Sequence, residues 1–319
     1  MARTLECSCD SVVRRIAHRQ LRKIGGVMSI LTCCNLLYIK FYTHRRNMFT
    51  FHNDSKKYVY HYTSVDTAVD YILTDETLLV GCYNKTNDPK ETKDWFFLPG
   101  TNYGKCLDEY TPQYLSKVMN PAIKETTHVI CFTKDEVLTG NLDDMAKRGC
   151  CKPRMWAQYG DRHKGVCLIF DFESLSDAFH DRFSEYNYNS NDVTYRDRDI
   201  AEIGMDPAYI VNVDALEDFG KLAYARAHAA KYKQRLFFEK ASDWSNENEY
   251  RWVLFDYDGN LPPKFHFKRS LKGIVFGADC DEDTIQKVVK ASLKLNPQYQ
   301  QLKWRNCAPW FNFERTKWV

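Results

Sequence analysis

The sequence predicts one α+β domain over residues 56–319, with a mixed or antiparallel central sheet of short strands and helices around it. Short apolar runs typical of buried strands alternate with amphipathic helical segments along this stretch. Neither an internal repeat nor a low-complexity linker divides it. A chain of 319 residues with 44% hydrophobic residues is long enough to bury one sizeable core or two modest ones.

The first elements are marked by local signals. Residues 58–62 predict a strand, and Thr63-Ser64 is a natural N-cap for a helix, because apolar residues follow it at helical spacing. Asn87-Asp88-Pro89 favours a turn in the loop at 84–89. Further strands are expected near 77–80, 128–132, 165–170, 192–195, 244–255 and 272–276, and helices near 112–119, 155–160, 213–240 and 281–295.

The charge is unevenly distributed. The formal net charge is +3, but residues 1–47 hold nine Lys and Arg against two acids, so the rest of the chain is mildly acidic. This excludes a basic field over the whole domain of the kind that binds nucleic acid. A local basic patch, such as 147–154, stays open.

Residues 1–55 are expected to be a basic extension that is disordered or lies upstream of the true start. Basic residues at 14–23 precede an apolar run at 27–39, which is shorter than the ~20 residues of a membrane span. Positive charge on both sides of the run and the lack of a small-residue cleavage site argue against a signal peptide. We therefore expect no stable membrane insertion, although a helix on the membrane surface is a third interpretation.

The cysteine pattern favours reduced thiols in the cytoplasm. None of the 12 cysteines forms a Cys-x-x-Cys pair. Adjacent pairs, Cys33-Cys34 and Cys150-Cys151, suit neither a zinc knuckle nor a small disulfide scaffold.

The most informative segment is 244–255, which carries two carboxylates into a run that predicts a buried strand. Side chains alternate along a strand, so Glu247, Glu249 and Arg251 are expected on one face. Carboxylates on a rigid strand suit stabilisation of a developing positive charge or binding of a sugar hydroxyl. The alternative is a Glu249–Arg251 surface pair on an edge strand, worth little energetically.

Other polar positions interrupt apolar elements, and each has an ordinary structural explanation. A strand histidine is usually a satisfied core or surface residue, and Asn-Asp-Pro is usually a turn. Aromatic residues three apart usually pack in a core. The further candidate residues are His61, Thr63, Asn87, Asp88, Trp156, Tyr159, His163 and Tyr195.

The order of these motifs resembles a bacterial family known only as a domain of unknown function. The chain departs from that pattern at Thr86, where the family has Phe, and in a longer insert before Met155. The matching motifs are Tyr60-His61-Tyr62-Thr63, Asn87-Asp88-Pro89-Lys90-Glu91, Cys131-Phe132-Thr133, Met155-Trp156-Ala157-Gln158-Tyr159, His163-Lys164-Gly165-Val166-Cys167, Val193-Thr194-Tyr195 and Trp244 to Arg251.

A second resemblance, to the ADP-ribosyltransferase superfamily in its histidine-tyrosine-glutamate form, rests on His61-Tyr62-Thr63 and on the late Glu-x-Glu. It implies an ADP-ribosyltransferase-like fold and NAD as a substrate, with no metal. His61, with Thr63 beside it, takes the adenosine-side ribose, and Glu249 holds a hydroxyl of the nicotinamide ribose. Either Tyr159 or Tyr195 stacks on nicotinamide.

Under this resemblance Glu247 activates the acceptor as a general base, and Arg251 holds a diphosphate or orients Glu249. The acceptor is a macromolecule, and the biological setting is a toxin or phage-defence effector with an antitoxin or inhibitory partner. The hypothesis requires His61 and Glu249 to lie on neighbouring strands and to face one cleft.

Two other functions compete with this one. In a metal-dependent nuclease, Asp88, Glu91, Glu247 and Glu249 bind a divalent cation and His61 activates water, although Arg251 beside them would repel a cation. In a non-enzymatic binding module, a groove is lined by Trp156, Tyr159, Trp244 and Trp252.

Overall fold

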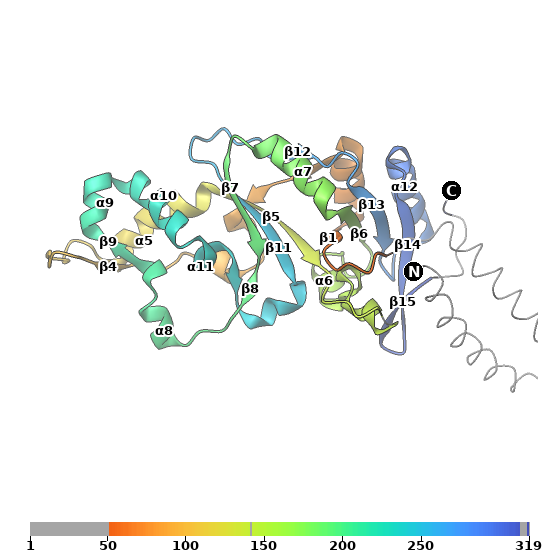
Figure 1. The fold of residues 1–319 in the computed structure, drawn as a ribbon, viewed down its shortest axis with the longest axis horizontal. Coiled ribbons are helices and arrows are strands. Elements are labelled where there is room, and N and C mark those ends of the chain that lie inside the picture. The colour runs from red at the N-terminus through yellow and green to blue at the C-terminus, as the bar shows by residue number, and fades with distance from the viewer. Residues whose placement is uncertain (1–50, 141, 313–317, 319) are drawn as a thin grey trace, which may run out of the picture. The chain divides into compact units, whose positions relative to one another are not determined.

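A computed structural model describes residues 51–140, 142–312 and 318 (Figure 1). They belong to one compact unit, Phe51–Val319. The expectations for residues 1–50 lie outside the described residues. Residues 51–55, predicted as part of the extension, belong to the folded unit instead, since Phe51 stacks on Phe311 with ring centroids 5.5 Å apart.

A nine-stranded mixed sheet forms the centre of the fold, as the sequence predicted. Its order is β15-β14-β13-β6-β1-β5-β11-β7, with β3 paired to β5. The pairings are antiparallel except for the parallel β13 and β14. The strands are β1 (Tyr58–Thr63), β3 (Gly81–Cys82), β5 (Thr127–Lys134), β6 (Val166–Asp171), β7 (Asn187–Asp192), β11 (Glu249–Phe255), β13 (Leu271–Phe276), β14 (Gln298–Arg305) and β15 (Ala308–Phe311).

Three two-stranded ribbons and a set of short helices complete the unit. The ribbons pair β8 (Thr194–Tyr195) with β10 (Glu239–Lys240), β2 (Thr77–Leu79) with β12 (Lys264–His266), and β4 (Leu98–Gly100) with β9 (Ile210–Asn212). The α-helices are α3 (Val65–Thr67), α4 (Pro89–Thr92), α5 (Pro112–Asn120), α6 (Pro153–Gln158), α7 (Phe172–Phe183), α8 (Ile200–Gly204), α9 (Val213–Phe219), α10 (Lys221–Lys231), α11 (Lys233–Phe237) and α12 (Glu282–Ser292). The π and 3₁₀ segments are η1 (Ala68–Leu73), η2 (Tyr83–Lys85), η3 (Pro121–Glu125), η4 (Leu142–Lys147), η5 (Gly149–Cys151), η6 (Pro207–Tyr209), η7 (Ser242–Glu247) and η8 (Leu293–Leu295).

Three predicted elements differ from the structure. The strand expected over 192–195 is divided between the end of β7 and β8, which belong to different sheets. The helix expected over 213–240 is broken into α9, α10 and α11, and Gly220 at the first break has a φ of 78° that favours glycine. The strand expected from residue 244 begins only at Glu249, because residues before it form the 3₁₀ segment η7.

Helices cover both faces of the sheet (Figure 1), so each face has its own apolar core. On one face Phe132, Phe170 and Trp252 pack against η1, α7 and α12. On the other face Val129 and Val253 pack against α5, α9, α10 and α11. This second face carries the polar residues described below.

Trp252 lies at the centre of the first core. Its ring is 5.2 Å from that of Phe132 and 5.0 Å from that of Phe179. We expect Trp252→Ala to lower the free energy of unfolding by about 3–5 kcal/mol, because it removes these contacts and leaves a cavity. Urea unfolding followed by circular dichroism measures the loss. The exposed Phe96 is the matched control, and Phe96→Ala should change stability by less than about 0.5 kcal/mol. Equal losses in both variants would contradict this core.

Candidate functional site

The start of β11 is fixed by a left-handed residue and by hydrogen bonds from neighbouring segments. Asn248 has φ 42° and ψ 57°, which ends η7 and turns the chain into the strand. Its side-chain amide donates to the carbonyl oxygens of Lys134 and Asp135, both at 3.0 Å. The hydroxyl of Tyr195 accepts the main-chain N–H of Glu249 at 2.9 Å. Glu247 and Glu249 therefore flank a turn, rather than sharing a strand face as predicted.

Arg251 is 1% exposed and its guanidinium is bound on all sides. Nε lies 2.5 Å from Oε1 of Glu249, and Nη2 lies 2.5 Å from Oε1 of Glu91. Nη1 donates to the carbonyl oxygen of Phe237 at 2.9 Å. The alternative of a surface pair on an edge strand is wrong, because β11 lies between β5 and β7 and both glutamates are buried. Arg251 thus orients Glu249, and its donors are already used.

Lys240 joins the two carboxylates that the sequence singled out. Its Nζ lies 2.7 Å from Oε2 of Glu247 and 2.8 Å from Oε2 of Glu249. It lies on β10, where it is paired with Tyr195 of β8, and the Trp244 ring is 5.1 Å from the ammonium. Lys240 was not predicted as a site residue, because a single lysine between a helix and a loop belongs to no periodic pattern of apolar and polar residues.

Tyr159 connects the buried charges to the surface. It caps α6, is half-buried, and donates its hydroxyl to Oε1 of Glu247 at 2.8 Å. The exposed Asn87 lies near this hydroxyl, and its side chain opposes the rise in the pKa of Tyr159. Next to it, the buried Asp88 caps α4 by accepting the N–H of Lys90 at 2.9 Å, and α4 carries Glu91. We call Asn87, Glu91, Tyr159, Lys240, Glu247, Glu249 and Arg251 the charged network.

The two neighbouring glutamates have opposite pKa shifts. Burial raises the pKa of Glu249, but the charges of Arg251 and Lys240 outweigh it and lower that pKa to about 2. Burial also raises the pKa of Glu247, and there the charge of Glu249 adds to the rise against the opposing Lys240. Burial and the adjacent Glu247 raise the pKa of Tyr159 as well, so its hydroxyl stays protonated and donates.

The charge balance of the network explains these directions. Within the described residues, Lys240 and Arg251 make the ion pairs of Glu91, Glu247 and Glu249, while Lys90 and Lys124 interact with Glu91 beyond ion-pair distance. Glu247 and Glu249 share the ammonium of Lys240, so a proton or a positive group from outside is favoured at one of these two carboxylates. Glu247 is the carboxylate whose pKa is raised and the one that contacts the surface-connected Tyr159.

His61 does not share this site, which corrects the predicted arrangement. Thr133 of β5 is paired with Tyr60 of β1 on one side and with Glu249 of β11 on the other. Since side chains alternate along a strand, His61 points to the face opposite Glu249, where its ring lies 5.7 Å from Phe132. The strands β1 and β11 are also not neighbours, because β5 lies between them.

Three further candidates lie outside the network. Thr63 shares the face of His61 on β1 and is buried. Trp156 is a core residue, edge-on to Tyr62 at 5.0 Å, and its Nε1 donates to the carbonyl oxygen of Cys150 at 2.8 Å. His163 stacks on Trp156 at 6.5 Å, at the end of three successive left-handed residues, 161–163.

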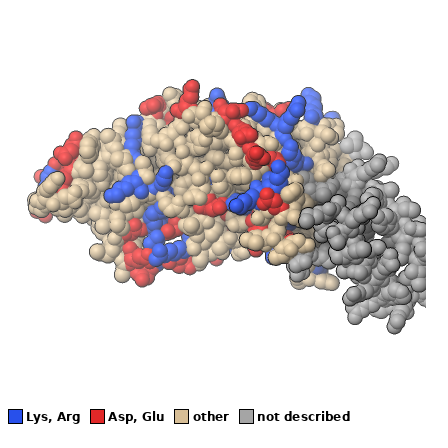
Figure 2. Space-filling model, viewed as in Figure 1, with Lys and Arg blue, Asp and Glu red and all other residues tan. Residues whose placement is uncertain are grey.

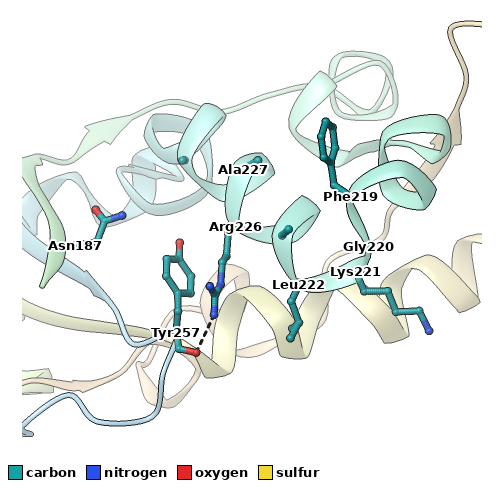
Figure 3. A pocket seen from close by; sticks show the side chains of 10 residues that line it. Asn187, Phe219, Gly220, Lys221, Leu222, Arg226, Ala227 and Tyr257 are labelled. Carbon is teal, nitrogen blue, oxygen red and sulfur yellow. Dashed lines mark hydrogen bonds between the residues drawn. The ribbon is translucent and has the colours of Figure 1, made fainter.

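Acidic and basic side chains are interspersed on the face shown in Figure 2. A surface groove of about 880 Å³ runs along α10, and none of its lining residues belongs to the charged network. Figure 3 shows Arg226 in this groove, donating to the carbonyl oxygen of Tyr257 at 2.9 Å.

Comparison with known proteins gives one family. A model described as a protein of unknown function (DUF2971) matches residues 155–252. Over this segment the chain is similar to that family. The matched segment contains Tyr195 of β8 and five members of the charged network: Tyr159, Lys240, Glu247, Glu249 and Arg251. Neither a curated protein nor a solved structure matches the chain.

The described residues contain neither a metal-binding cluster nor a membrane-spanning helix. Across residues 51–140 and 142–312, no group of three or more His, Cys, Asp and Glu is arranged to hold a metal ion. Within the same ranges, none of the helices has the length and apolar character needed to cross a membrane.

We expect Arg251→Met to lower the free energy of unfolding by about 3–5 kcal/mol, because it leaves Glu91 and Glu249 buried without their cation. Chemical denaturation at neutral pH measures this. The control is Arg196→Met, which breaks an exposed pair with Glu202 and should cost less than about 1 kcal/mol. A similar small loss in both variants would show that the guanidinium is not needed for the fold.

Stability should depend on acid pH through Glu249. Its folded pKa of about 2 lies below that of an unfolded chain, so its contribution is complete above about 4.3 and is lost as the pH falls toward 2. The raised pKa of Glu247 has the opposite effect on stability. Because the folded state binds this proton more tightly than the unfolded chain, the stability it contributes is lost as the pH rises. We expect the stability difference between wild type and Glu249→Gln to shrink from pH 5 to pH 2. Urea unfolding across this range measures it, and a constant difference would contradict the assignment.

Proposed function

We propose that the protein cleaves a glycosidic bond at the Glu247–Glu249 pair, with NAD as the donor and a macromolecule as the acceptor. The observation that carries the proposal is that one lysine holds both glutamates while their pKa values shift in opposite directions. Neighbouring carboxylates with separated pKa values are the usual arrangement of acid and base groups in enzymes that act on sugars. The choice of NAD comes from the sequence resemblance.

The contacts assign different roles to the two glutamates. Both oxygens of Glu249 are held by Arg251 and Lys240. Glu247 contacts Lys240 through one oxygen and Tyr159, which leads to the surface, through the other. We therefore assign the reacting position to Glu247 and a charge-setting position to Glu249. Glu247 keeps the general-base role that the resemblance implies, and the contact with the nicotinamide ribose passes to it from Glu249.

The chemistry follows from the charge on NAD. The nicotinamide ring carries a positive charge, and its binding beside Glu247 favours the ionised form of that carboxylate. When the bond to ribose breaks, its electron pair leaves with the ring, which becomes neutral, and the positive charge passes to the sugar. An ionised Glu247 stabilises that charge electrostatically. The acceptor then attacks the sugar carbon and gives its proton to Glu247.

Aromatic side chains border this position. Tyr159, Tyr195 and Trp244 are half-buried around Lys240 and the two glutamates. Tyr195 uses its hydroxyl to hold the start of β11, whereas Tyr159 contacts the reacting glutamate. Tyr159 is therefore the better candidate to stack on the nicotinamide ring.

This proposal departs from the histidine-tyrosine-glutamate arrangement, because it gives His61 and Thr63 no role. The sequence resemblance alone supports a macromolecular acceptor. It is also the basis for a role as a toxin or phage-defence effector with an inhibitory partner.

The nuclease alternative is less well supported by the contacts. Each of its four carboxylates already has a protein partner: Asp88 caps α4, Glu91 and Glu249 hold Arg251, and Glu247 holds Lys240. At Glu91, Glu247 and Glu249 a divalent cation would have to compete with Arg251 or Lys240 in a buried site.

The test is release of nicotinamide from labelled NAD with and without a chelator. We expect release to survive chelation and to fall at least about a hundredfold in Glu247→Gln, which removes the general base. His61→Gln is the matched control and should keep activity near that of the wild type, with folding checked by circular dichroism. Activity retained by Glu247→Gln, or lost in folded His61→Gln, would contradict the proposed site. Chelator-sensitive cleavage of nucleic acid would support the nuclease. Absence of both reactions would support a binding module.

A further inference from the structure

A thiol and an imidazole lie in contact at the end of β5, outside the charged network. Cys82 of β3 is the direct cross-strand partner of His128. The Sγ atom of Cys82 is 3.6 Å from Nε2 of His128, and both side chains are half-buried. Proximity of a nucleophile and a base is the first requirement for an activated thiol.

His128 lies on the face of the sheet opposite the charged network. It is paired with Leu254 of β11, a residue of the first core, and Leu254 is paired in turn with Tyr188 of β7. The nearby charged group is Asp256, which follows β11 and whose carboxylate holds the main-chain N–H groups of Asn260 and Leu261. The pair is therefore separate from Glu247 and Glu249.

The imidazole is in the state that accepts a proton. Burial lowers the pKa of His128, against the opposing charge of Asp256, so the ring is neutral near pH 7. Its Nδ1 is buried and has no hydrogen-bond partner in the part of the chain that the structure describes. Nε2 is the ring nitrogen that contacts the thiol, so it is the position that would accept the thiol proton when Nδ1 carries the ring hydrogen.

Other described cysteines provide an internal comparison. Cys106 and Cys307 are exposed, and within the described residues neither has an imidazole contact of this kind. Accessibility alone would make these two the more reactive thiols, whereas activation by a base would make Cys82 the more reactive.

We propose that Cys82 is a site of covalent modification by low-molecular-weight disulfides, with His128 as the base that activates it. The thiol gives its proton to Nε2 of His128, and the resulting thiolate attacks one sulfur of the disulfide. The disulfide bond breaks as the new Cys82 mixed disulfide forms. The departing thiolate takes the proton from His128, so protein and reagent exchange one thiol for another. This inference does not depend on the proposed glycosidic chemistry.

The experiment treats the reduced full-length protein with less than one equivalent of an aromatic disulfide that releases a coloured thiolate. Mass spectrometry of peptides then assigns the label, so cysteines outside the described residues do not interfere. We expect Cys82 to be labelled faster than Cys106 and Cys307. In His128→Gln, which keeps a polar group at the same place, labelling of Cys82 should slow at least about tenfold while that of Cys106 is unchanged.

Two results would overturn the proposal. One is labelling of Cys106 or Cys307 ahead of Cys82 in the wild type, a comparison that needs no variant to fold. The other is an unchanged rate at Cys82 in folded His128→Gln. Neither outcome bears on nicotinamide release, so failure here is distinct from failure of the proposed function.

Discussion

The buried guanidinium of Arg251 is the constraint on which the rest of this site depends. An arginine removed from water must have its donors bonded, and its partners must come from wherever the chain can supply them. Here they come from three separate segments: Glu91 at α4, Phe237 at the end of α11, and Glu249 on the same strand. Meeting this requirement brings α4 and α11 against β11, and it leaves one side of Glu249 for Lys240.

A series of contacts connects Glu249 to the surface. Lys240 carries the contact from Glu249 to Glu247, and Tyr159 carries it from Glu247 toward the exposed Asn87. The carboxylate with the raised pKa is thus the one nearest the surface. A buried carboxylate that favours a positive group beside it fits a reaction in which positive charge enters on the substrate and moves onto a sugar. The same burial that raises the pKa of Glu247 also excludes the water that would weaken this interaction.

Much of this could be predicted from the sequence, because local patterns carry it. Apolar strands and capped helices indicated the α+β class and the mixed sheet, and Glu247, Glu249, Arg251, Tyr159, Asn87 and Asp88 were singled out as polar residues in ordered surroundings. The sequence could not show that His61 and Glu249 lie on opposite faces of the sheet. Alternation fixes the relative direction of side chains within one strand, but the register of β1 and β11 against β5 decides how His61 lies relative to Glu249. Lys240 lies at the site because β10 pairs with β8, and no periodic pattern in the sequence predicts this two-stranded ribbon. Asn248 in the left-handed region removed Glu247 from the strand, which only backbone geometry reveals.

The central claim is that the pKa values of the two neighbouring glutamates are shifted in opposite directions from the ordinary glutamate value. It is tested most directly by carboxyl-carbon NMR of protein labelled in its glutamate side chains, with Glu247→Gln and Glu249→Gln used to assign the two resonances. The account predicts that Glu247 titrates above the ordinary glutamate value of about 4.3, while Glu249 stays ionised until the solution is strongly acidic. Titration of both carboxyls together near the ordinary value would contradict it.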